Sequence, residues 1–401
     1  MSFEDPKEST FDGVLIDKNS RSQVVGPFGT ENSHLASGGF VLDTVVNLLY
    51  NSILSPLFTV FLSIILYQVR STHLAFTISC LWSSVICLTR IWNQINRLYS
   101  NQRSPLFHSK KLRWKEQVVL VTGGGSGIGA CLAETLAARN AKVVVLTREE
   151  SKHNANYDNI HTYKCDVSVY KEVEKAAVQI RKEVGDPTII VNNAGVVKGK
   201  LLLDLTEEDI NSTFGSNTLA QFWILKIFLP AMLRQGAGHV VTMSSLLGIV
   251  SAAQMSDYCA SKAAVLSLHQ TLRLELDNRY HSPTIRTTLV VPAYTVTSLF
   301  SRVKLPSNCL FSFLCPPVQP DTIAKQIIDA LEENESRIIR LPSYTNLARF
   351  SGDAVGLVPA WMRDFVQWLS GADHAMTEYG PRPDAGERLA MERRNEFRDE
   401  D

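Results

Sequence analysis

The sequence has no excess of charge of either sign. Its 40 lysines and arginines balance its 40 aspartates and glutamates, so the formal net charge of the 401 residues is zero at pH 7. Binding to a nucleic acid draws on a basic surface, and this composition supplies none to the chain as a whole. We therefore predict no nucleic-acid partner.

The sequence also lacks a cysteine framework. Its seven cysteines are an odd number with no C-x-x-C pair, and they lie in apolar stretches. That placement is typical of buried thiols and not of a disulfide or zinc framework. We expect free thiols, no metal site, and a main domain in a reducing compartment that faces the cytosol. Internal repeats are absent, and the first residues lack the basic stretch of a cleavable secretory signal.

Hydrophobic residues are concentrated near the N-terminus. Residues 1–39 are polar and without periodicity, and we predict that they are disordered. Residues 44–69 and 74–89 then form two uncharged runs. Because a bilayer core needs ~20 apolar residues per helix, the first run is long enough to span it and the second is marginal. Pro56 is expected to kink the first helix or to begin it.

These two runs predict a membrane anchor over residues 40–92. Neither run has the polar stripe of a helix on the surface of a soluble domain, although a pair of buried core helices is the alternative. The sequence leaves open whether the anchor is a hairpin or one span followed by an interfacial helix. Arg70, in the turn between the runs, counts slightly against a hairpin.

Basic residues follow the second run. Seven lysines and arginines, and no acid, lie between Arg90 and Lys115. Positive charge beside a hydrophobic segment marks the cytosolic side of a membrane and favours contact with anionic headgroups. We interpret residues 93–115 as a basic linker on that side; the alternative is an ordinary solvated run of charge.

From residue 116 onward, apolar β-branched runs alternate with helical patterns. The runs lie at 117–121, 142–146, 188–191, 239–243 and 286–291, and one of the helices is expected over 168–184. Continuous apolar strands that alternate with helices indicate a parallel sheet covered on both faces. We predict an α/β domain with a doubly wound, Rossmann-type parallel sheet over residues 116–345. Residues 346–401 form a C-terminal extension whose charged end, 381–401, we predict to be disordered.

A glycine-rich segment, TGGGSGIG, stands between the first strand and the first helix of this domain. Glycines permit a tight turn and a close approach of the backbone, and the helix N-terminus offers free N–H groups to a pyrophosphate. A glycine cluster alone is a weak signal, but its position between a strand and a helix favours a dinucleotide site over a chance cluster. The candidate residues are Thr122, Gly123, Ser126, Gly127, Ile128 and Gly129.

The end of the second strand predicts which dinucleotide binds. An NAD site carries an acid there, which would repel the 2′-phosphate of NADP, whereas this chain has Thr147 followed by Arg148. We predict NADP(H) as the cofactor; the alternative is that Arg148 is a surface residue whose charge Glu149 and Glu150 offset. Further candidate contacts follow the third and fourth strands: Asp166, Asn193, Ala194 and Gly195.

Four polar residues form a candidate catalytic set. Tyr258 and Lys262 are four residues apart and so share one face of a helix. A phenol titrates near pH ~10, and an adjacent ammonium is expected to lower its pKa so that it exchanges a proton with a carbonyl oxygen. Ser245 is placed to hydrogen-bond the same oxygen, and Asn217 to hold a water that links Lys262 to solvent.

The motifs TGGGSGIG, NNAG, SSLLG and YCASK, with the Asn217 helix, together resemble the short-chain dehydrogenase/reductase family over roughly residues 115–345. The resemblance implies that Asn217, Ser245, Tyr258 and Lys262 are the catalytic tetrad. It also implies that Tyr258 and Lys262 contact the cofactor, Lys262 at the nicotinamide ribose.

The segment from Pro292 to Thr297 resembles the family's nicotinamide-carboxamide site. Ala293 departs from the glycine that usually follows this proline. A closer resemblance, carried by the hydrophobic N-terminus, the basic linker and residues 341–384, is to the membrane-bound retinol, retinaldehyde and steroid dehydrogenases. This branch implies residence in the endoplasmic reticulum or on lipid droplets, with the catalytic domain facing the cytosol. The family also implies a possible homodimer.

Two apolar segments bear on the substrate. The connection 298–316 would suit a lid over an apolar substrate, or ordinary packing on the core. Trp361, Phe365 and Trp368 recur at helical spacing, and we expect them to pack on the domain rather than on a membrane.

The expected function is NADPH-dependent reduction of a lipophilic ketone or aldehyde of the retinoid, steroid or fatty aldehyde class, with the reverse oxidation open. The alternatives are a reductase of 3-ketosphinganine or a 3-ketoacyl thioester, and a membrane or lipid-droplet scaffold without catalysis.

Overall fold

A computed structural model of the chain describes residues 41–69, 72–101, 112–149, 157–301, 303, 313, 315–348, 358–370 and 375–376. Both segments predicted to be disordered, 1–39 and 381–401, lie outside these residues. Much of the apolar connection 298–316 and part of the basic linker also lie outside them.

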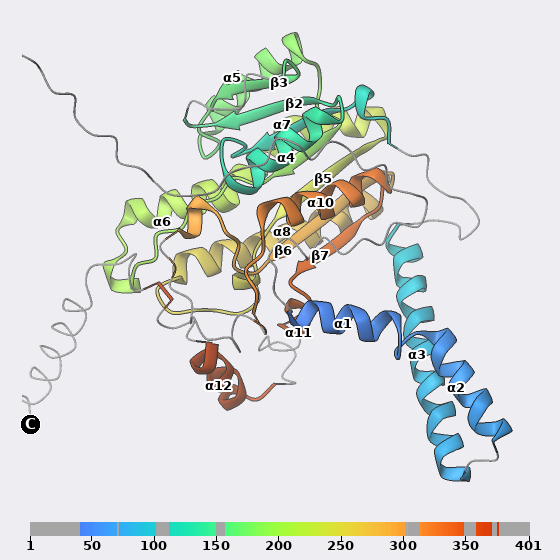
Figure 1. Cartoon of the computed structure of the whole chain (residues 1–401). Helices are drawn as coiled ribbons and strands as arrows, with labels where there is room; N and C mark the ends of the chain where they lie inside the picture. The colour runs from blue at the N-terminus through green and yellow to red at the C-terminus, as the bar shows by residue number, and fades with distance from the viewer. Residues whose placement is uncertain are drawn as a thin grey trace, which may run out of the picture. The chain divides into compact units, whose positions relative to one another are not determined.

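Seven parallel strands form one sheet in the order β3-β2-β1-β4-β5-β6-β7 (Figure 1). In the centre of the sheet, Val119 lies opposite Val143 on one side and Ile189 on the other. The predicted doubly wound parallel sheet is confirmed. The strands are β1 (Val118–Thr122), β2 (Lys142–Thr147), β3 (Ile160–Lys164), β4 (Ile189–Asn192), β5 (Gly238–Met243), β6 (Ile285–Pro292) and β7 (Arg337–Leu341).

Helices cover both faces of this sheet, as Figure 1 shows. On one face, Leu132 and Leu136 of α4 pack with the side chains of α10 against the sheet; on the other, Ile180 of α5 and Phe228 of α7 do so with α8. The strand order reverses between β1 and β4, and in such sheets a crevice opens there at the carboxyl ends of the strands. The α-helices described after β1 are α4 (Gly127–Ala138), α5 (Tyr170–Glu183), α6 (Glu207–Phe214), α7 (Ala220–Gln235), α8 (Ser256–Asn278), α10 (Pro320–Glu332), α11 (Thr345–Ala348) and α12 (Ala360–Ser370).

In the described part of the chain, three α-helices precede the sheet: α1 (Leu42–Asn51), α2 (Pro56–Gln68) and α3 (His73–Ser100). Among the described residues only α3 is long and apolar enough to cross a membrane by itself, whereas α1 and α2 are bent by 55° at the break between them. The sequence predicted the reverse, with the first run spanning and the second marginal. Ser55 caps α2 by accepting a hydrogen bond from Phe58 N, and Pro56 begins the helix, so the first run cannot form one straight helix.

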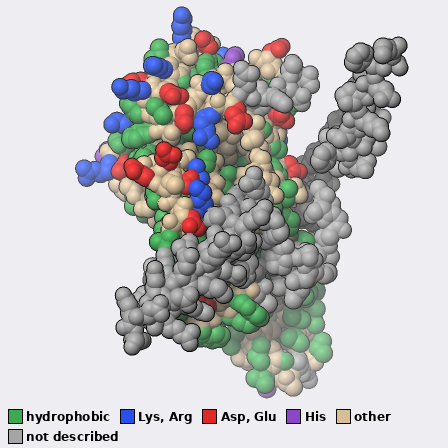
Figure 2. All heavy atoms as spheres, turned by 90° about the vertical axis from the view of Figure 1, so that its left-hand side faces the viewer, with side chains coloured by type: hydrophobic (Ala, Val, Ile, Leu, Met, Phe, Trp, Pro, Cys, Tyr) green, Lys and Arg blue, Asp and Glu red, His purple; other side chains and the backbone are tan. Residues whose placement is uncertain are grey.

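Helices α2 and α3 pack with their small polar side chains facing each other. Every buried residue of the pair is a serine or threonine except Ile86, and the Ser63 and Ser83 hydroxyls lie 3.1 Å apart. Large apolar side chains point outward, such as Leu57, which is 86% exposed. Figure 2 shows hydrophobic side chains gathered at the lower end of the view, where Figure 1 has the tips of α2 and α3. In a soluble helix pair, apolar side chains lie between the helices and polar ones face the solvent. The opposite arrangement, which α2 and α3 have, is typical of helices in lipid.

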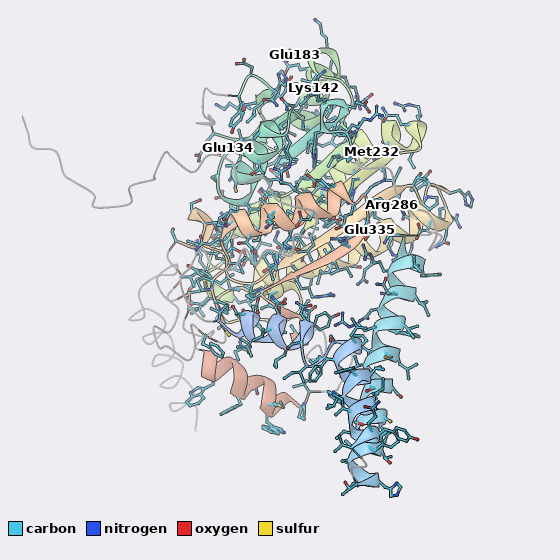
Figure 3. All side chains as sticks on the ribbon, turned by 45° about the vertical axis from the view of Figure 1, so that its right-hand side comes forward. Glu134, Lys142, Glu183, Met232, Arg286 and Glu335 are labelled. Atoms are coloured by element: carbon cyan, nitrogen blue, oxygen red, sulfur yellow. The ribbon has the colours of Figure 1, made fainter. Side chains whose placement is uncertain are left out.

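The end of α3 is hydrogen-bonded to the α/β domain. Asn101 is buried; its Oδ1 accepts from Ser336 N at 2.7 Å, and its Nδ2 donates to Ser336 O at 3.3 Å. The guanidinium of Arg286 donates to Asn101 O at 2.6 Å, and Arg97 pairs with Glu335 at 2.7 Å; Figure 3 labels Arg286 and Glu335. Helix α3 thus contacts the β7 edge of the sheet, and it runs through the predicted boundary between residues 92 and 93.

Removing the Asn101 side chain should destabilise this junction. Asn101→Ala leaves Ser336 N and O without their partner inside the protein, and we expect the free energy of unfolding to fall by about 2 kcal/mol. Denaturant unfolding of the full chain in detergent measures this change. Asn96→Ala, at an exposed position of the same helix, is the control and should change stability by less than about 0.5 kcal/mol. Equal losses in the two variants would contradict the assignment.

Candidate active site

A cleft lies at the carboxyl ends of the strands, where the strand order reverses. Most of the site residues predicted from the sequence line it, although they come from segments far apart in the chain. These lining residues are Gly123, Ser126, Gly127, Ile128, Thr147, Arg148, Asp166, Asn193, Ala194, Gly195, Ser245, Tyr258, Lys262, Pro292 and Thr297.

Two predicted cofactor residues, Thr122 and Gly129, lie behind the wall of the cleft and shape it. The buried Thr122 Oγ1 accepts hydrogen bonds from the backbone N–H groups of Asn193 and Ala194, both at 3.0 Å. The Asn193 amide in turn donates to Thr122 O and Gly123 O. A Cβ on Gly129 would lie 2.5 Å from that amide. The end of β4 can therefore pack against the glycine turn only because residue 129 has no side chain.

The glycine turn has the conformation that a bound pyrophosphate requires. Gly123 and Gly127 have φ values of 63° and 56°, in the left-handed region that favours glycine. The helix α4 begins at Gly127, and the Ser126 side chain makes no capping hydrogen bond to its first turn. The free N–H groups of that turn are a suitable site for an anion, so the turn fits a dinucleotide.

The adenosine end of the cleft carries Thr147, Arg148 and Glu149. No carboxylate stands at Thr147, as the sequence indicated, but Glu149 lies in the same wall as Arg148. Asp166 also lines the cleft, and its Oδ1 accepts from Ser168 N at 2.9 Å and from the Ser168 hydroxyl at 2.7 Å. One carboxylate oxygen of Asp166 is therefore used in a local turn.

Three of the four predicted catalytic side chains meet at the other end of the cleft. Tyr258 and Lys262 are buried on α8, and the Lys262 ammonium lies 5.7 Å from the centre of the phenol ring. Lys262 also donates to Met243 O at 3.1 Å. Ser245 precedes a short 3-10 helix, Leu246–Gly248, its hydroxyl accepts a hydrogen bond from Leu247 N at 3.2 Å, and it lines the cleft together with Tyr258.

The fourth residue, Asn217, lies behind these side chains in a π-helical turn, η4 (Gly215–Leu219), between α6 and α7. Its Oδ1 accepts from Val196 N at 2.7 Å, and its Nδ2 donates to Val196 O and to the Ser261 hydroxyl at 3.1 and 2.9 Å. A Cβ on Gly195 would lie 3.2 Å from this Oδ1 and 3.5 Å from the Lys262 ammonium. Asn217 therefore ties the segment after β4 to the helix that carries Lys262, and Gly195 leaves room for both groups.

Burial dominates the ionisation of the catalytic pair. It raises the pKa of Tyr258 above the ordinary value of a phenol, although the nearby Ser245 hydroxyl opposes the shift. Burial also lowers the pKa of Lys262 to about 8. The direction for Tyr258 is opposite to the predicted lowering, because the loss of hydration exceeds the effect of any neighbour.

Several residues that line the cleft were not predicted as contacts from the sequence. Phe300 makes an edge-on contact with the Tyr258 ring, with 6.1 Å between the ring centres, and belongs to the apolar connection after β6. Only the apolar character of that connection could have indicated it. The other lining residues that were not predicted as contacts are Gly125, Leu146, Glu149, Cys165, Val167, Val196, Ser216, Met243, Ser244, Ala293, Thr295, Ser298 and Leu299. Of these, Gly125, Ser244 and Ala293 lie within motifs that the sequence analysis identified.

Comparison with known proteins agrees with this geometry. A family model described as short chain dehydrogenase matches residues 117–306. Short-chain dehydrogenase/reductase 3 of Bos taurus is 37% identical over 233 residues, which are 55% of this chain and 74% of the relative. This chain belongs to the short-chain dehydrogenase/reductase family. 17-beta-hydroxysteroid dehydrogenase 13 of Rattus norvegicus is 35% identical over 58% of this chain and 77% of the relative. Epidermal retinol dehydrogenase 2 of Mus musculus is 34% identical, with 55% and 72% covered.

A solved member of the family has the same fold. The short chain dehydrogenase/reductase from Burkholderia phymatum in complex with NAD aligns with a TM-score of 0.52 and 25% identity, over 60% of this chain and 94% of that one. Family membership makes this chain an oxidoreductase that interconverts an alcohol and its carbonyl compound with a nicotinamide dinucleotide.

Proposed function

We propose that this protein reduces a lipophilic ketone or aldehyde with NADPH at a membrane, and that it also catalyses the reverse oxidation. The observation that carries the proposal is the buried group of Tyr258, Lys262 and Ser245 at one end of a cleft whose other end fits a dinucleotide. When bound, the nicotinamide supplies or takes up the hydride.

The side chains supply the proton and hold the substrate oxygen. Tyr258 donates its proton to the carbonyl oxygen in reduction and accepts it from the hydroxyl in oxidation. Ser245, which lines the cleft together with Tyr258, donates a hydrogen bond to the same oxygen. The charge of Lys262 favours the phenolate once the proton has left. Asn217 contacts neither oxygen and acts as a positioning residue through Val196 and Ser261.

The pH profile of the enzyme should follow Lys262. Its pKa of about 8 means that the ammonium is present below that pH and is lost as the pH rises through it, whereas the phenol titrates at much higher pH. We therefore expect kcat/KM for reduction to fall about tenfold per pH unit above about pH 8. Lys262→Arg carries a charge that does not titrate in this range and should give a slower but flat profile. An unchanged profile in that variant would exclude Lys262 as the titrating group.

The preference for NADPH rests on Arg148 in the cleft wall and on the missing acid at Thr147. Arg148→Ala should raise the KM for NADPH about tenfold, because a charge-assisted hydrogen bond to the 2′-phosphate is lost, and should leave the KM for NADH unchanged. Arg139→Ala is the control, since Arg139 pairs with Glu332 outside the cleft. An unmodified enzyme that used NADH better than NADPH would refute this part of the proposal.

The substrate class is inferred from the apolar surroundings of Tyr258 and from relatives named as retinol and hydroxysteroid dehydrogenases. Retinoids, steroids and fatty aldehydes all suit such a site. A reconstituted enzyme should therefore be assayed with NADPH and with NADH on retinal, a ketosteroid and a long-chain aldehyde, alongside 3-ketosphinganine and a 3-ketoacyl thioester. Turnover confined to the last two would identify a biosynthetic keto-lipid reductase instead.

The proposed location is the endoplasmic reticulum or lipid droplets, with the α/β domain in the cytosol. Two observations support it. Helices α2 and α3 pack through small polar side chains, as helices in lipid do, and the basic residues Arg90 and Arg97 lie toward the end of α3 that joins the domain, as expected for the cytosolic side. Protease treatment of sealed microsomes tests the orientation, because a cytosolic domain is digested without detergent. The homodimer implied by the family stays a prediction.

A further inference from the structure

The C-terminal extension contains a helix with an uncovered aromatic stripe. In α12, Trp361, Phe365 and Trp368 are 70%, 52% and 71% exposed. Their spacing places them within roughly 60° of the helix circumference. The rings of Phe365 and Trp368 lie 6.0 Å apart, so the stripe is continuous. Sequence reasoning favoured packing of these side chains on the domain, and the exposed fractions contradict it.

The composition of α12 indicates what covers this stripe. Two tryptophans and a phenylalanine on one face are costly to expose to water, and tryptophan is the residue most typical of a membrane–water interface. The helix sequence contains one arginine and one aspartate, so its net charge is zero. A partner that binds through opposite charge therefore gains little from this helix, whereas a lipid surface binds such a helix by burying its apolar side chains.

We propose that α12 lies in the headgroup region of the membrane that holds the anchor, with Trp361, Phe365 and Trp368 inserted among the lipids. The anchor makes this contact intramolecular, so that a helix too short to bind a membrane strongly by itself stays bound. The occupant is a phospholipid surface, and neither a second copy of the chain nor a soluble protein is required.

The same segment reaches the catalytic residues. Met376 follows the last residue of α12 by six positions; it is buried and packs in one apolar cluster with Tyr258, Met255 and Cys259. Six residues span at most about 20 Å, so Met376 lies within that distance of the end of α12. Binding of α12 to lipid thus holds a wall of the site close to the membrane. For a lipophilic substrate, which rests on the proposed function, this shortens the route from lipid to Tyr258.

Quenching of tryptophan fluorescence tests the contact without any assay of activity. Full-length protein is reconstituted in phosphatidylcholine vesicles whose acyl chains are brominated near the headgroup. The signal of Trp361 and Trp368 is the difference between the wild type and the Trp361→Phe/Trp368→Phe variant. We expect brominated lipid to quench more than half of this difference, and aqueous acrylamide to quench it less than in detergent. The proposal would be overturned if acrylamide quenched this fluorescence difference as strongly as in detergent. It would also be overturned if neither acrylamide nor brominated lipid quenched it, because protein would then cover the two tryptophans.

Kinetics then test the link to the site. In vesicles, the Trp361→Ala/Phe365→Ala/Trp368→Ala variant should show a KM several-fold higher for a membrane-dissolved substrate, with kcat unchanged. Its KM for a short water-soluble carbonyl compound should stay the same. Tyr280→Ala, which removes a partly exposed aromatic residue outside the site, is the matched control. An equal rise in KM for both substrates would show damage to the site instead of loss of lipid contact. Enzyme inactive on every carbonyl compound would refute the proposed function and leave the quenching result standing.

Discussion

Replacing Tyr258 with phenylalanine is expected to lower kcat for carbonyl reduction by about a thousandfold. The variant lacks only the hydroxyl, which is the group that gives its proton to the substrate oxygen. The ring remains in its buried place against Phe300, so the fold and the cleft should be unchanged. Steady-state consumption of reduced nicotinamide measures the rate, and direct titration with the dinucleotide should give a dissociation constant within about threefold of the wild type.

The same substitution elsewhere provides the control. Tyr163 lies on the edge strand β3, where its hydroxyl donates to Glu183 at 2.7 Å, and Tyr163→Phe should leave kcat unchanged. A Tyr258→Phe variant that kept full activity would remove the phenol from the chemistry. A variant that lost all turnover and still fulfilled the cellular role would favour the non-catalytic scaffold.

The central sheet and most of the site could be predicted because their signals are local. The five buried strands are short apolar runs, and Tyr258 and Lys262 meet because a helix places residues four apart on one face. The strands for which no apolar run was identified, β3 and β7, are the two edges of the sheet. Each is covered less completely, so IHTYK and RIIRL carry polar residues and lack a continuous apolar run.

Other features depend on contacts between distant segments. The rise in the pKa of Tyr258 follows from its complete burial, which no spacing in the sequence reveals. The hydrogen bonds of Asn101 with Ser336 join residues 235 positions apart. For the same reason the exposure of α12 could not be predicted, because an aromatic stripe has the same pattern whether protein or lipid covers it.

Adding a single methyl group at Gly129 should have the largest effect on cofactor binding. In Gly129→Ala the new Cβ would lie 2.5 Å from both Asn193 Nδ2 and Gly123 O. Contacts that short are not tolerated, and Gly123 O belongs to the backbone of the turn. The turn must therefore open and the Asn193 amide must leave its two acceptors, Thr122 O and Gly123 O. We expect the free energy of unfolding to fall by about 1–3 kcal/mol.

The opened turn should also bind the dinucleotide poorly. Its N–H groups hold the pyrophosphate only in the closed arrangement, and losing one or two charge-assisted hydrogen bonds raises the dissociation constant on the order of 100-fold. Calorimetric titration measures this change. Gly236→Ala is the control, because it introduces backbone strain without a steric clash. Gly236 has a φ of 64°, and a Cβ there meets nothing within 4 Å. That variant should lose about 1–2 kcal/mol of stability and keep its affinity for the dinucleotide. If Gly129→Ala bound the dinucleotide as tightly as the wild type, the packing of the β4 end against the glycine turn would not be required for cofactor binding.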